Sequence, residues 1–122
     1  MNAQAQQQTA AITGWGHALP AALVTSEMLE KTYGLKAGSL AKATGVKTRF
    51  IADRLGPETQ VELGLRAARA ALECADVGAD GLDLIIAASA VPYQLIPSTA
   101  PLYQRGLGLL DGACQVLDVN TT

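Results

Sequence analysis

The sequence holds one histidine and two cysteines, the residue types that commonly serve as base and nucleophile. His17 is the sole imidazole, so any Ser-His or Cys-His mechanism contained in this chain would have to use it. Cys74 and Cys114 lie far apart without a C-x-x-C pairing, which gives no indication of a disulfide scaffold or a zinc site. We expect His17 in a turn and both cysteines as small buried thiols, with a His17–cysteine dyad as the catalytic alternative.

Two glycines, in Gly14-Trp15-Gly16, invite comparison with a dinucleotide-binding loop. The rest of that fingerprint is missing, because Leu19 stands where a glycine is needed and Pro20 follows it. The pair is therefore interpreted as two permissive residues where a strand turns into a loop.

Two further polar residues have structural explanations. Ser98 lacks the G-x-S-x-G elbow that exposes a nucleophile, and it is placed to cap a helix. Asp118 lies inside an apolar stretch, where a carboxylate is costly without a partner, so we expect it to accept hydrogen bonds. The residue inventory alone contains no complete catalytic apparatus.

Length and composition exclude several classes of protein. The chain has 122 residues, 49% of them hydrophobic and 16% charged, with a net charge of −2. This fits one globular domain without the basic field that attracts nucleic acid or an anionic membrane. No apolar run approaches the ~20 residues that span a bilayer, and the start of the sequence is unlike an export signal, so a cytoplasmic location is expected.

The elements that must position these side chains alternate between strands and helices. Residues 1–9 are polar and Gln-rich and are expected to form a flexible arm before the domain over residues 10–122. Between Leu35 and Asp53 only a weak helical turn and a short strand are indicated. With that short strand included, the predicted order is strand, helix, short strand, helix, strand, helix and strand. The corresponding ranges are Ala10–Trp15, Ser26–Tyr33, Arg49–Ala52, Pro57–Cys74, Leu82–Ser89, Thr99–Gly106 and Cys114–Val119.

This order predicts an α/β fold with a mainly parallel sheet flanked by helices. The stretch from Leu82 to Ser89 is apolar on both alternating faces, as in strands that are covered from both sides. The long helix has apolar residues at helical spacing on one face, and the spacing predicts ion pairs such as Glu62–Arg66 on the other.

Four motifs follow one another along the chain: Gly14-x-Gly16-x-x-Leu19-Pro20, Ala43-Thr44-Gly45, Ile96-Pro97-Ser98 and Val116-Leu117-Asp118-Val119. This series resembles the amino-terminal part of ketoacyl-acyl-carrier-protein synthase III, one of the thiolase-like condensing enzymes. The resemblance covers nearly everything after residue 9. It implies the amino-terminal part of the layered thiolase-like fold.

The resemblance also implies where the chemistry lies. In that family a nucleophilic cysteine follows the strand that resembles Val116–Val119, so here it would be the residue after Thr122. The family's histidine and asparagine belong to its second half. No catalytic residue is therefore assigned in this chain, and His17, Cys114 and Asn120 do not take these roles.

Two substrate-binding residues are expected from the resemblance. The family grips coenzyme A with an aromatic residue and an arginine before its Thr-Gly, but Ser39 and Ala43 stand there, and only Thr44 and the following glycine match. A donor other than coenzyme A is therefore an alternative. Ile96 stands where the family reaches toward the acyl pocket of a partner subunit, and packing on its own core is the alternative.

The leading hypothesis is the amino-terminal part of a 3-oxoacyl-acyl-carrier-protein synthase III-like enzyme, inactive alone, without a metal or cofactor. Its expected partners are acyl-coenzyme A or acyl carrier protein thioesters and either a second copy or a complementary carboxy-terminal half. No nucleic acid or membrane partner is expected. The alternatives are a non-catalytic split subunit that pairs with a cysteine-bearing chain, and a small hydrolase-like α/β enzyme that uses His17.

Overall fold

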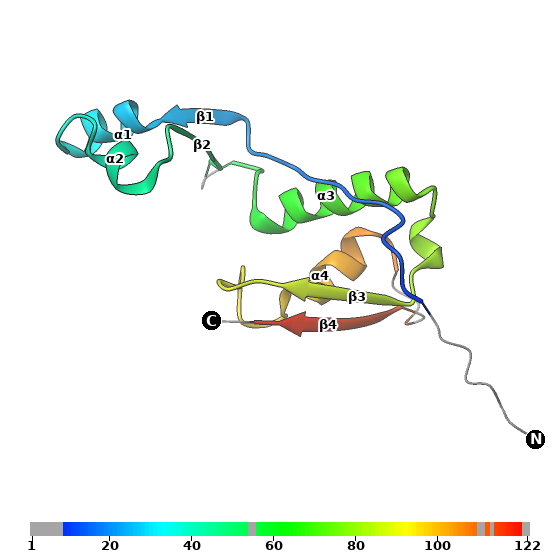
Figure 1. Ribbon diagram of the computed structural model, residues 1–122. Helices are drawn as coiled ribbons and strands as arrows, with labels where there is room; N and C mark the ends of the chain where they lie inside the picture. Colours follow the sequence, from blue (N-terminus) through cyan, green and yellow to red (C-terminus); the bar gives the residue numbers. More distant parts are fainter. Residues whose placement is uncertain (1–8, 54–55, 110–111, 113, 121–122) are drawn as a thin grey trace, which may run out of the picture.

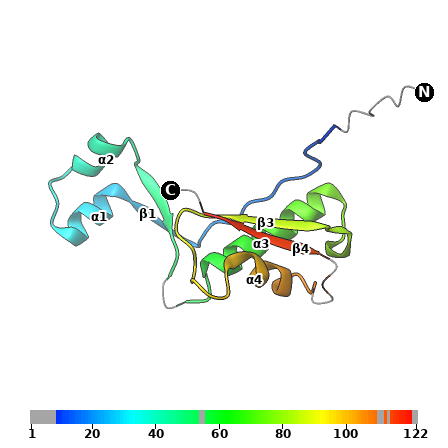
Figure 2. The same ribbon diagram turned by 90° about the horizontal axis from the view of Figure 1, so that it is seen from below.

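The computed structural model describes residues 9–53, 56–109, 112 and 114–120. The predicted arm over residues 1–9 therefore lies almost wholly outside the described residues. Two parts are visible along the chain in Figures 1 and 2, a small lobe over residues 22–51 and a larger body over residues 60–119. Within the described ranges, no helix is long and apolar enough to cross a membrane.

The lobe consists of a two-stranded ribbon and two short helices. Strand β1 (Ala22–Thr25) pairs antiparallel with β2 (Thr48–Ile51), and helices α1 (Ser26–Tyr33) and α2 (Ser39–Thr44) lie between them in sequence. Figure 1 shows both helices at the outer end of the ribbon, away from the body. The predicted weak helical turn is thus a helix of six residues.

Helix α1 has the predicted bounds because both of its ends are capped. The Thr25 side chain accepts a hydrogen bond from the Met28 backbone N–H at 3.1 Å, which satisfies one free donor of the first turn. Gly34 ends the helix with φ 64°, a left-handed conformation that glycine adopts without a steric penalty.

The body consists of a two-stranded parallel sheet, two helices and a 3₁₀ turn. Strand β3 (Leu84–Ala88) pairs parallel with β4 (Gln115–Val119), in a register that sets Ile86 opposite Leu117. Helix α4 (Thr99–Gly106) packs on both strands and on α3 (Gln60–Ala75), and a 3₁₀ turn, η1 (Ala79–Gly81), precedes β3. Among the described residues, the buried apolar ones all belong to the body: Leu65, Ala87, Ala100, Leu109 and Cys114.

The prediction of a mainly parallel sheet is confirmed in part. The pair β3–β4 is parallel, whereas β1–β2 is antiparallel. The prediction that β3 is covered on both faces is wrong for this chain. Leu84 and Ile86 are 46% and 57% exposed, and Leu117 and Val119 on β4 are 51% and 36% exposed. We call these four residues the exposed sheet face.

The predicted first strand, Ala10–Trp15, is not a strand in the structure. Residues 9–20 run as an extended segment along α3 (Figure 1), and no strand in the described part of the chain pairs with them. A Cβ atom at Gly16 would lie 2.3 Å from the Ala67 carbonyl oxygen, and one at Gly14 would lie 2.6 Å from that of Ala71. The glycines therefore permit close contact with a helix, rather than the turn that was predicted.

Helix α3 starts later than predicted, because Thr59 caps it by accepting from the Glu62 backbone N–H at 3.1 Å. Its last residue is Ala75, and the cap residue that follows, Asp76, adopts φ 55°. The predicted Glu62–Arg66 pair is replaced by a contact of 4.0 Å between Arg66 and Glu58. Strand β2 lies one residue earlier than predicted.

Candidate functional site

Thr44, the first predicted substrate-binding residue, is the last residue of α2 and is exposed. Its hydroxyl donates to the Leu40 carbonyl at 2.7 Å and accepts from the Val46 N–H at 3.2 Å. Gly45 follows in a left-handed conformation, φ 71°, and turns the chain toward β2. Thr44 thus helps to end the helix.

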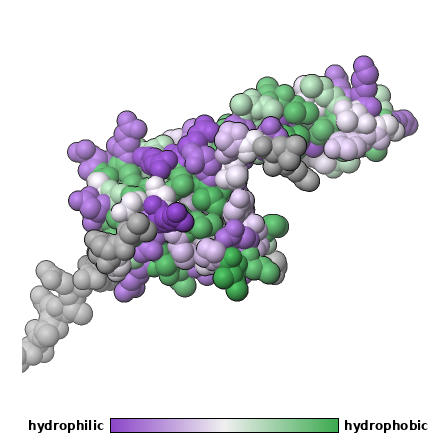
Figure 3. All heavy atoms as spheres, turned by 180° about the vertical axis from the view of Figure 1, so that it is seen from behind, coloured by the Kyte–Doolittle hydropathy of each residue, from purple (hydrophilic) through white to green (hydrophobic). Residues whose placement is uncertain are grey.

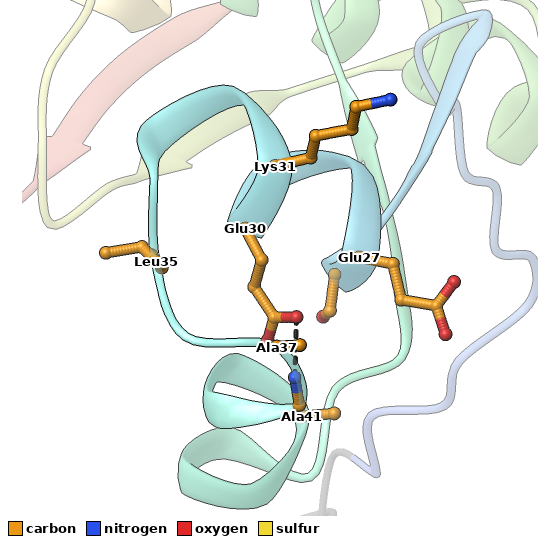
Figure 4. Close-up of a pocket in the computed structure, with 8 residues that line it drawn as sticks. Glu27, Glu30, Lys31, Leu35, Ala37 and Ala41 are labelled. Carbon is orange, nitrogen blue, oxygen red and sulfur yellow. Dashed lines mark hydrogen bonds between the residues drawn. The ribbon is translucent and has the colours of Figure 1, made fainter.

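A hollow of about 330 Å³ lies between α1 and α2, and Figure 4 shows its lining. The Glu30 side chain forms its floor. Glu30 is only 3% exposed. Its Oε2 accepts a hydrogen bond from the Gly38 N–H at 2.8 Å, and its Oε1 accepts one from the Leu40 N–H at 2.7 Å. One buried carboxylate therefore satisfies two free donors where α2 begins. Sequence reasoning missed this role, because only the folded turn brings Glu30 to that helix end.

A second hollow of about 390 Å³ adjoins the first. The two share Ser26, Glu27 and Ala41, and the second is also lined by Lys47 and by residues of the ribbon. Thr44 is absent from the lining of both hollows.

Ser26 and Arg49 tie the ribbon to α1 beneath these hollows. The buried Ser26 hydroxyl donates to the Val46 carbonyl at 2.6 Å and accepts from Arg49 Nη2 at 2.9 Å. The backbone N–H of Ser26 also donates to the Lys47 carbonyl at 2.8 Å. The lobe is therefore held together mainly by polar contacts.

Ile96, the second predicted substrate-binding residue, lies in the loop between β3 and α4 and is 90% exposed. It does not pack on the buried residues of the described chain. Val91 and Leu95 in the same loop are 76% and 84% exposed. Figure 3 shows hydrophobic side chains projecting from the body at the end that lies below the lobe. What Ile96 contacts stays a prediction.

Asp118 accepts hydrogen bonds, as predicted. Its Oδ1 accepts from the Thr99 N–H at 2.9 Å and the Ala100 N–H at 3.1 Å, so its charge lies at the positive end of α4. Ser98 occupies the cap position, but its side chain makes no capping bond, which corrects the expectation for Ser98. Burial, and secondly the negative charge of Asp118, raise the pKa of Tyr103 above its usual 10.0.

The His17–cysteine dyad is not formed. The exposed His17 ring stacks on Trp15, with 5.9 Å between the ring centroids, and the structure has no hydrogen bond between His17 and either cysteine. Cys114 is buried, but Cys74 is exposed, which corrects its predicted burial. Over the described ranges, no group of three or more histidine, cysteine or acidic residues is arranged to hold a metal ion.

Comparison with known proteins relates these features to a larger architecture. No family model matches the chain. A β-ketoacyl-acyl-carrier-protein synthase III of Rhizobium meliloti is 38% identical over 102 residues, which are 84% of this chain and 31% of that protein. The crystal structure of the 3-oxoacyl-acyl-carrier-protein synthase III of Aquifex aeolicus superimposes with a TM-score of 0.76 and 33% identity, covering 90% of this chain and 34% of that one.

A variant of OleA from Xanthomonas campestris superimposes with a TM-score of 0.80 at 27% identity, covering 93% of this chain and 34% of its own. The chain spans about a third of the length of the curated relatives that it matches. Fold and likeness together define the class: this is an α/β chain with the thiolase-like fold.

Within that class the chain is homologous to the amino-terminal part of β-ketoacyl-acyl-carrier-protein synthase III. The resemblance seen in the sequence motifs is thereby confirmed. The match extends over the lobe and the body alike, since it covers 90% of the chain in the Aquifex aeolicus superposition.

Proposed function

We propose that this chain is the amino-terminal part of a 3-oxoacyl-acyl-carrier-protein synthase III-like condensing enzyme of fatty acid or polyketide synthesis, and that it is inactive alone. The observation that carries the proposal is a match that covers most of this chain but only about a third of each relative. Among the described residues His17 makes no hydrogen bond with either cysteine, which supports the inactivity, because base and nucleophile must lie within reach of each other.

The proposed reaction has two steps in the complete protein. A cysteine thiolate first attacks an acyl thioester of coenzyme A or acyl carrier protein, so the acyl group moves to the cysteine sulfur and the carrier thiol leaves. A malonyl thioester then loses carbon dioxide, and the resulting carbanion attacks the acyl carbonyl. A carbon–carbon bond forms and the cysteine thiolate is released, while backbone amides hold the developing oxyanion.

The coding sequence beyond codon 122 tests this proposal directly. We expect a cysteine codon next and roughly two hundred further residues, the extent that the likeness implies. The protein encoded by the extended frame should condense acyl and malonyl thioesters, and replacing that cysteine by serine should abolish condensation. The 122-residue chain should show none. Condensation by the 122-residue chain alone would contradict the proposed inactivity.

The split-subunit alternative rests on the exposed sheet face. Its four apolar side chains are exposed in this chain, and exposed apolar patches often mark interfaces. A stop codon after Thr122, together with co-purification of a cysteine-bearing condensing-enzyme chain, would favour this alternative.

A second copy or a complementary carboxy-terminal half is the proposed cover of this face. We expect the isolated chain to associate, which analytical ultracentrifugation measures. A monomeric, fully soluble chain that unfolds cooperatively would contradict this expectation. A cytoplasmic location stays a prediction from the sequence.

Thr44 and Ile96 are proposed to bind substrate in the complete protein. Thr44 is exposed at the end of α2, and Ile96 projects into solvent from the loop before α4, where a partner's acyl pocket could receive it. Ile96→Ala should change the preference for acyl chain length without changing the stability of the fold. An unchanged preference would remove Ile96 from the site.

A further inference from the structure

The loop between β3 and α4 is held by polar contacts at both of its ends. At its start, the Ser89 backbone N–H donates to the Val119 carbonyl at 3.1 Å. At its end, Asp118 accepts hydrogen bonds from the first two N–H groups of α4, which fixes where that helix begins. The apolar side chains between these points project into solvent, and Ile96 is 90% exposed. Burial in the core therefore does little to decide where Ile96 lies.

A further polar contact comes from Gln60, the first residue of α3. Its Nε2 donates to the Ser89 hydroxyl oxygen at 3.1 Å and to the Val91 carbonyl at 3.3 Å. The Ser89 hydroxyl in turn donates to the same Val91 carbonyl at 2.6 Å. Both N–H groups of the amide and the hydroxyl proton thus have an acceptor, so the three groups form a closed set of hydrogen bonds at the start of the loop.

Gln60 belongs to a well-held part of the molecule. Thr59 caps α3 at its first turn, and the helix has 16 residues and packs on α4. Glu58, one residue before the cap, accepts a hydrogen bond from the Ala21 N–H at 3.0 Å and so ties down the approach to the helix. A group that positions others must itself be held, and the start of α3 meets this requirement.

A hollow of about 620 Å³ lies beside the loop. Val91 and Tyr93 of the loop line it together with Gln60, and Ala52 and Asp53, which follow β2, line it as well. The loop therefore has open space next to it, into which it can move when Gln60 does not hold it.

The second half of the loop is closed on itself. The Gln94 side chain donates from Nε2 to the Pro97 carbonyl at 3.0 Å, so this hydrogen bond spans Leu95 and Ile96. Only residues 92 and 93 link this closed turn to Val91. Holding Val91 in place therefore limits the directions in which Ile96 can point.

We propose that Gln60 is a positioning residue, which fixes the loop at Ser89 and Val91 and so sets the direction in which Ile96 is presented. The chemical consequence rests on the proposed function, because Ile96 would bind an acyl chain only in the complete protein. The positioning itself is a property of this chain and can be measured on it. The sequence pattern did not indicate this role, since Gln60 and Ser89 lie 29 residues apart.

A spin label beside Ile96 tests the proposal on the 122-residue chain. Leu95→Cys supplies the attachment site, because Leu95 is 84% exposed, and Cys74→Ser removes the exposed thiol and leaves only the buried Cys114. The electron paramagnetic resonance spectrum then reports the mobile fraction of the loop. Gln60→Glu keeps the size of the side chain but removes both donors and sets a carboxylate against the Val91 carbonyl. The ratio of mobile to held label should rise by about two- to tenfold.

A second substitution separates positioning from stability. Gln60→Lys keeps N–H donors for Ser89 and Val91, but a positive charge in the first turn disfavours α3, whereas the carboxylate of Gln60→Glu favours it. We therefore expect Gln60→Lys to keep the parental mobile fraction with a slightly lower urea midpoint. Gln60→Glu should raise the mobile fraction with an unchanged or slightly higher midpoint. The matched control Gln115→Glu, at an exposed position at the opposite end of the sheet, should leave the mobile fraction unchanged.

The positioning role and the proposed function can fail separately. The positioning role is overturned by an unchanged mobile fraction in Gln60→Glu, by an equal rise in Gln60→Lys or Gln115→Glu, or by a mobile fraction that follows the urea midpoint. In the complete protein, Gln60→Glu should also shift the preference for acyl chain length, measured as a ratio of kcat/KM values. A raised mobile fraction with an unchanged preference would contradict the proposed role of Ile96 and would support the positioning by Gln60.

Discussion

Adding one methyl group at Gly16 tests the contact between the extended segment and α3. In Gly16→Ala the new Cβ would lie 2.3 Å from the Ala67 carbonyl oxygen and 2.5 Å from the Ala71 backbone nitrogen. Ordinary contacts between carbon and oxygen begin near ~3.3 Å, so the segment must move away by about 1 Å. Both neighbours are backbone atoms of a helix and cannot yield by changing a rotamer.

The magnitude follows from two opposing effects. Overpacking costs about 1–3 kcal/mol, while alanine restricts the unfolded chain and offsets about 0.4–1 kcal/mol. We therefore expect a net loss of about 1–2 kcal/mol in the free energy of unfolding. With a urea dependence of about 1–3 kcal/mol per molar, the unfolding midpoint should fall by about 0.3–2 M.

Two optical probes separate local from global effects. Far-ultraviolet circular dichroism follows the helices, and the fluorescence anisotropy of Trp15, the only tryptophan, follows the segment itself. Thr13→Ala in the same segment is the control, because Thr13 is exposed and should change stability by less than about 0.5 kcal/mol. Ala71→Gly should not rescue Gly16→Ala, since the obstructing atoms belong to the backbone. An unchanged midpoint and an unchanged Trp15 anisotropy in Gly16→Ala would refute this reasoning.

Three other substitutions test single polar groups. Asp118→Asn should lower the free energy of unfolding by about 1–3 kcal/mol, measured in urea, because the amide cannot supply the charged acceptor at the start of α4; an unchanged value would mean that the charge contributes nothing. Glu30→Gln should lower the free energy of unfolding by a similar amount, because the NH₂ group of the new amide would face a backbone N–H. The control Glu27→Gln, on the exposed side of α1, should change it by less than about 0.5 kcal/mol. Tyr103 should ionise above pH 10.0, so the stability gained from its raised pKa is complete below that pH and is lost as the pH rises through the pKa of the folded state. The variant Tyr103→Phe should remove this part of the alkaline loss in a pH series of unfolding curves, and an identical series for both proteins would contradict the assignment.

The sequence predicted the elements that are decided locally. The bounds of the helices over 26–33 and 99–106 are confirmed. For the first of them, a threonine cap and a closing glycine lie within the same few residues that form the helix. The carboxylate of Asp118 was also correctly expected to need a partner, because its surroundings in the sequence are apolar.

Features that depend on tertiary contacts were not predictable. Gly14 and Gly16 are explained by the backbone of α3, some fifty residues later in the chain, and Glu30 by a turn whose shape no local pattern specifies. The stretch 10–15 was predicted as a strand from its apolar run, but no strand pairs with it within the described residues. For Thr44 and Ile96 the motif suggested a role, and only substrate or partner contacts will establish it.

The exposed sheet face has a consequence for how the chain would fare in a cell. Its apolar residues lie on a sheet of only two described strands, which resembles the surface that folding intermediates display and that chaperones and proteases recognise. Such a chain, produced without its cover, would have a lifetime set by quality control rather than by its own unfolding. Its abundance would then follow the supply of whatever polypeptide shields that face, so synthesis of the two would have to be matched.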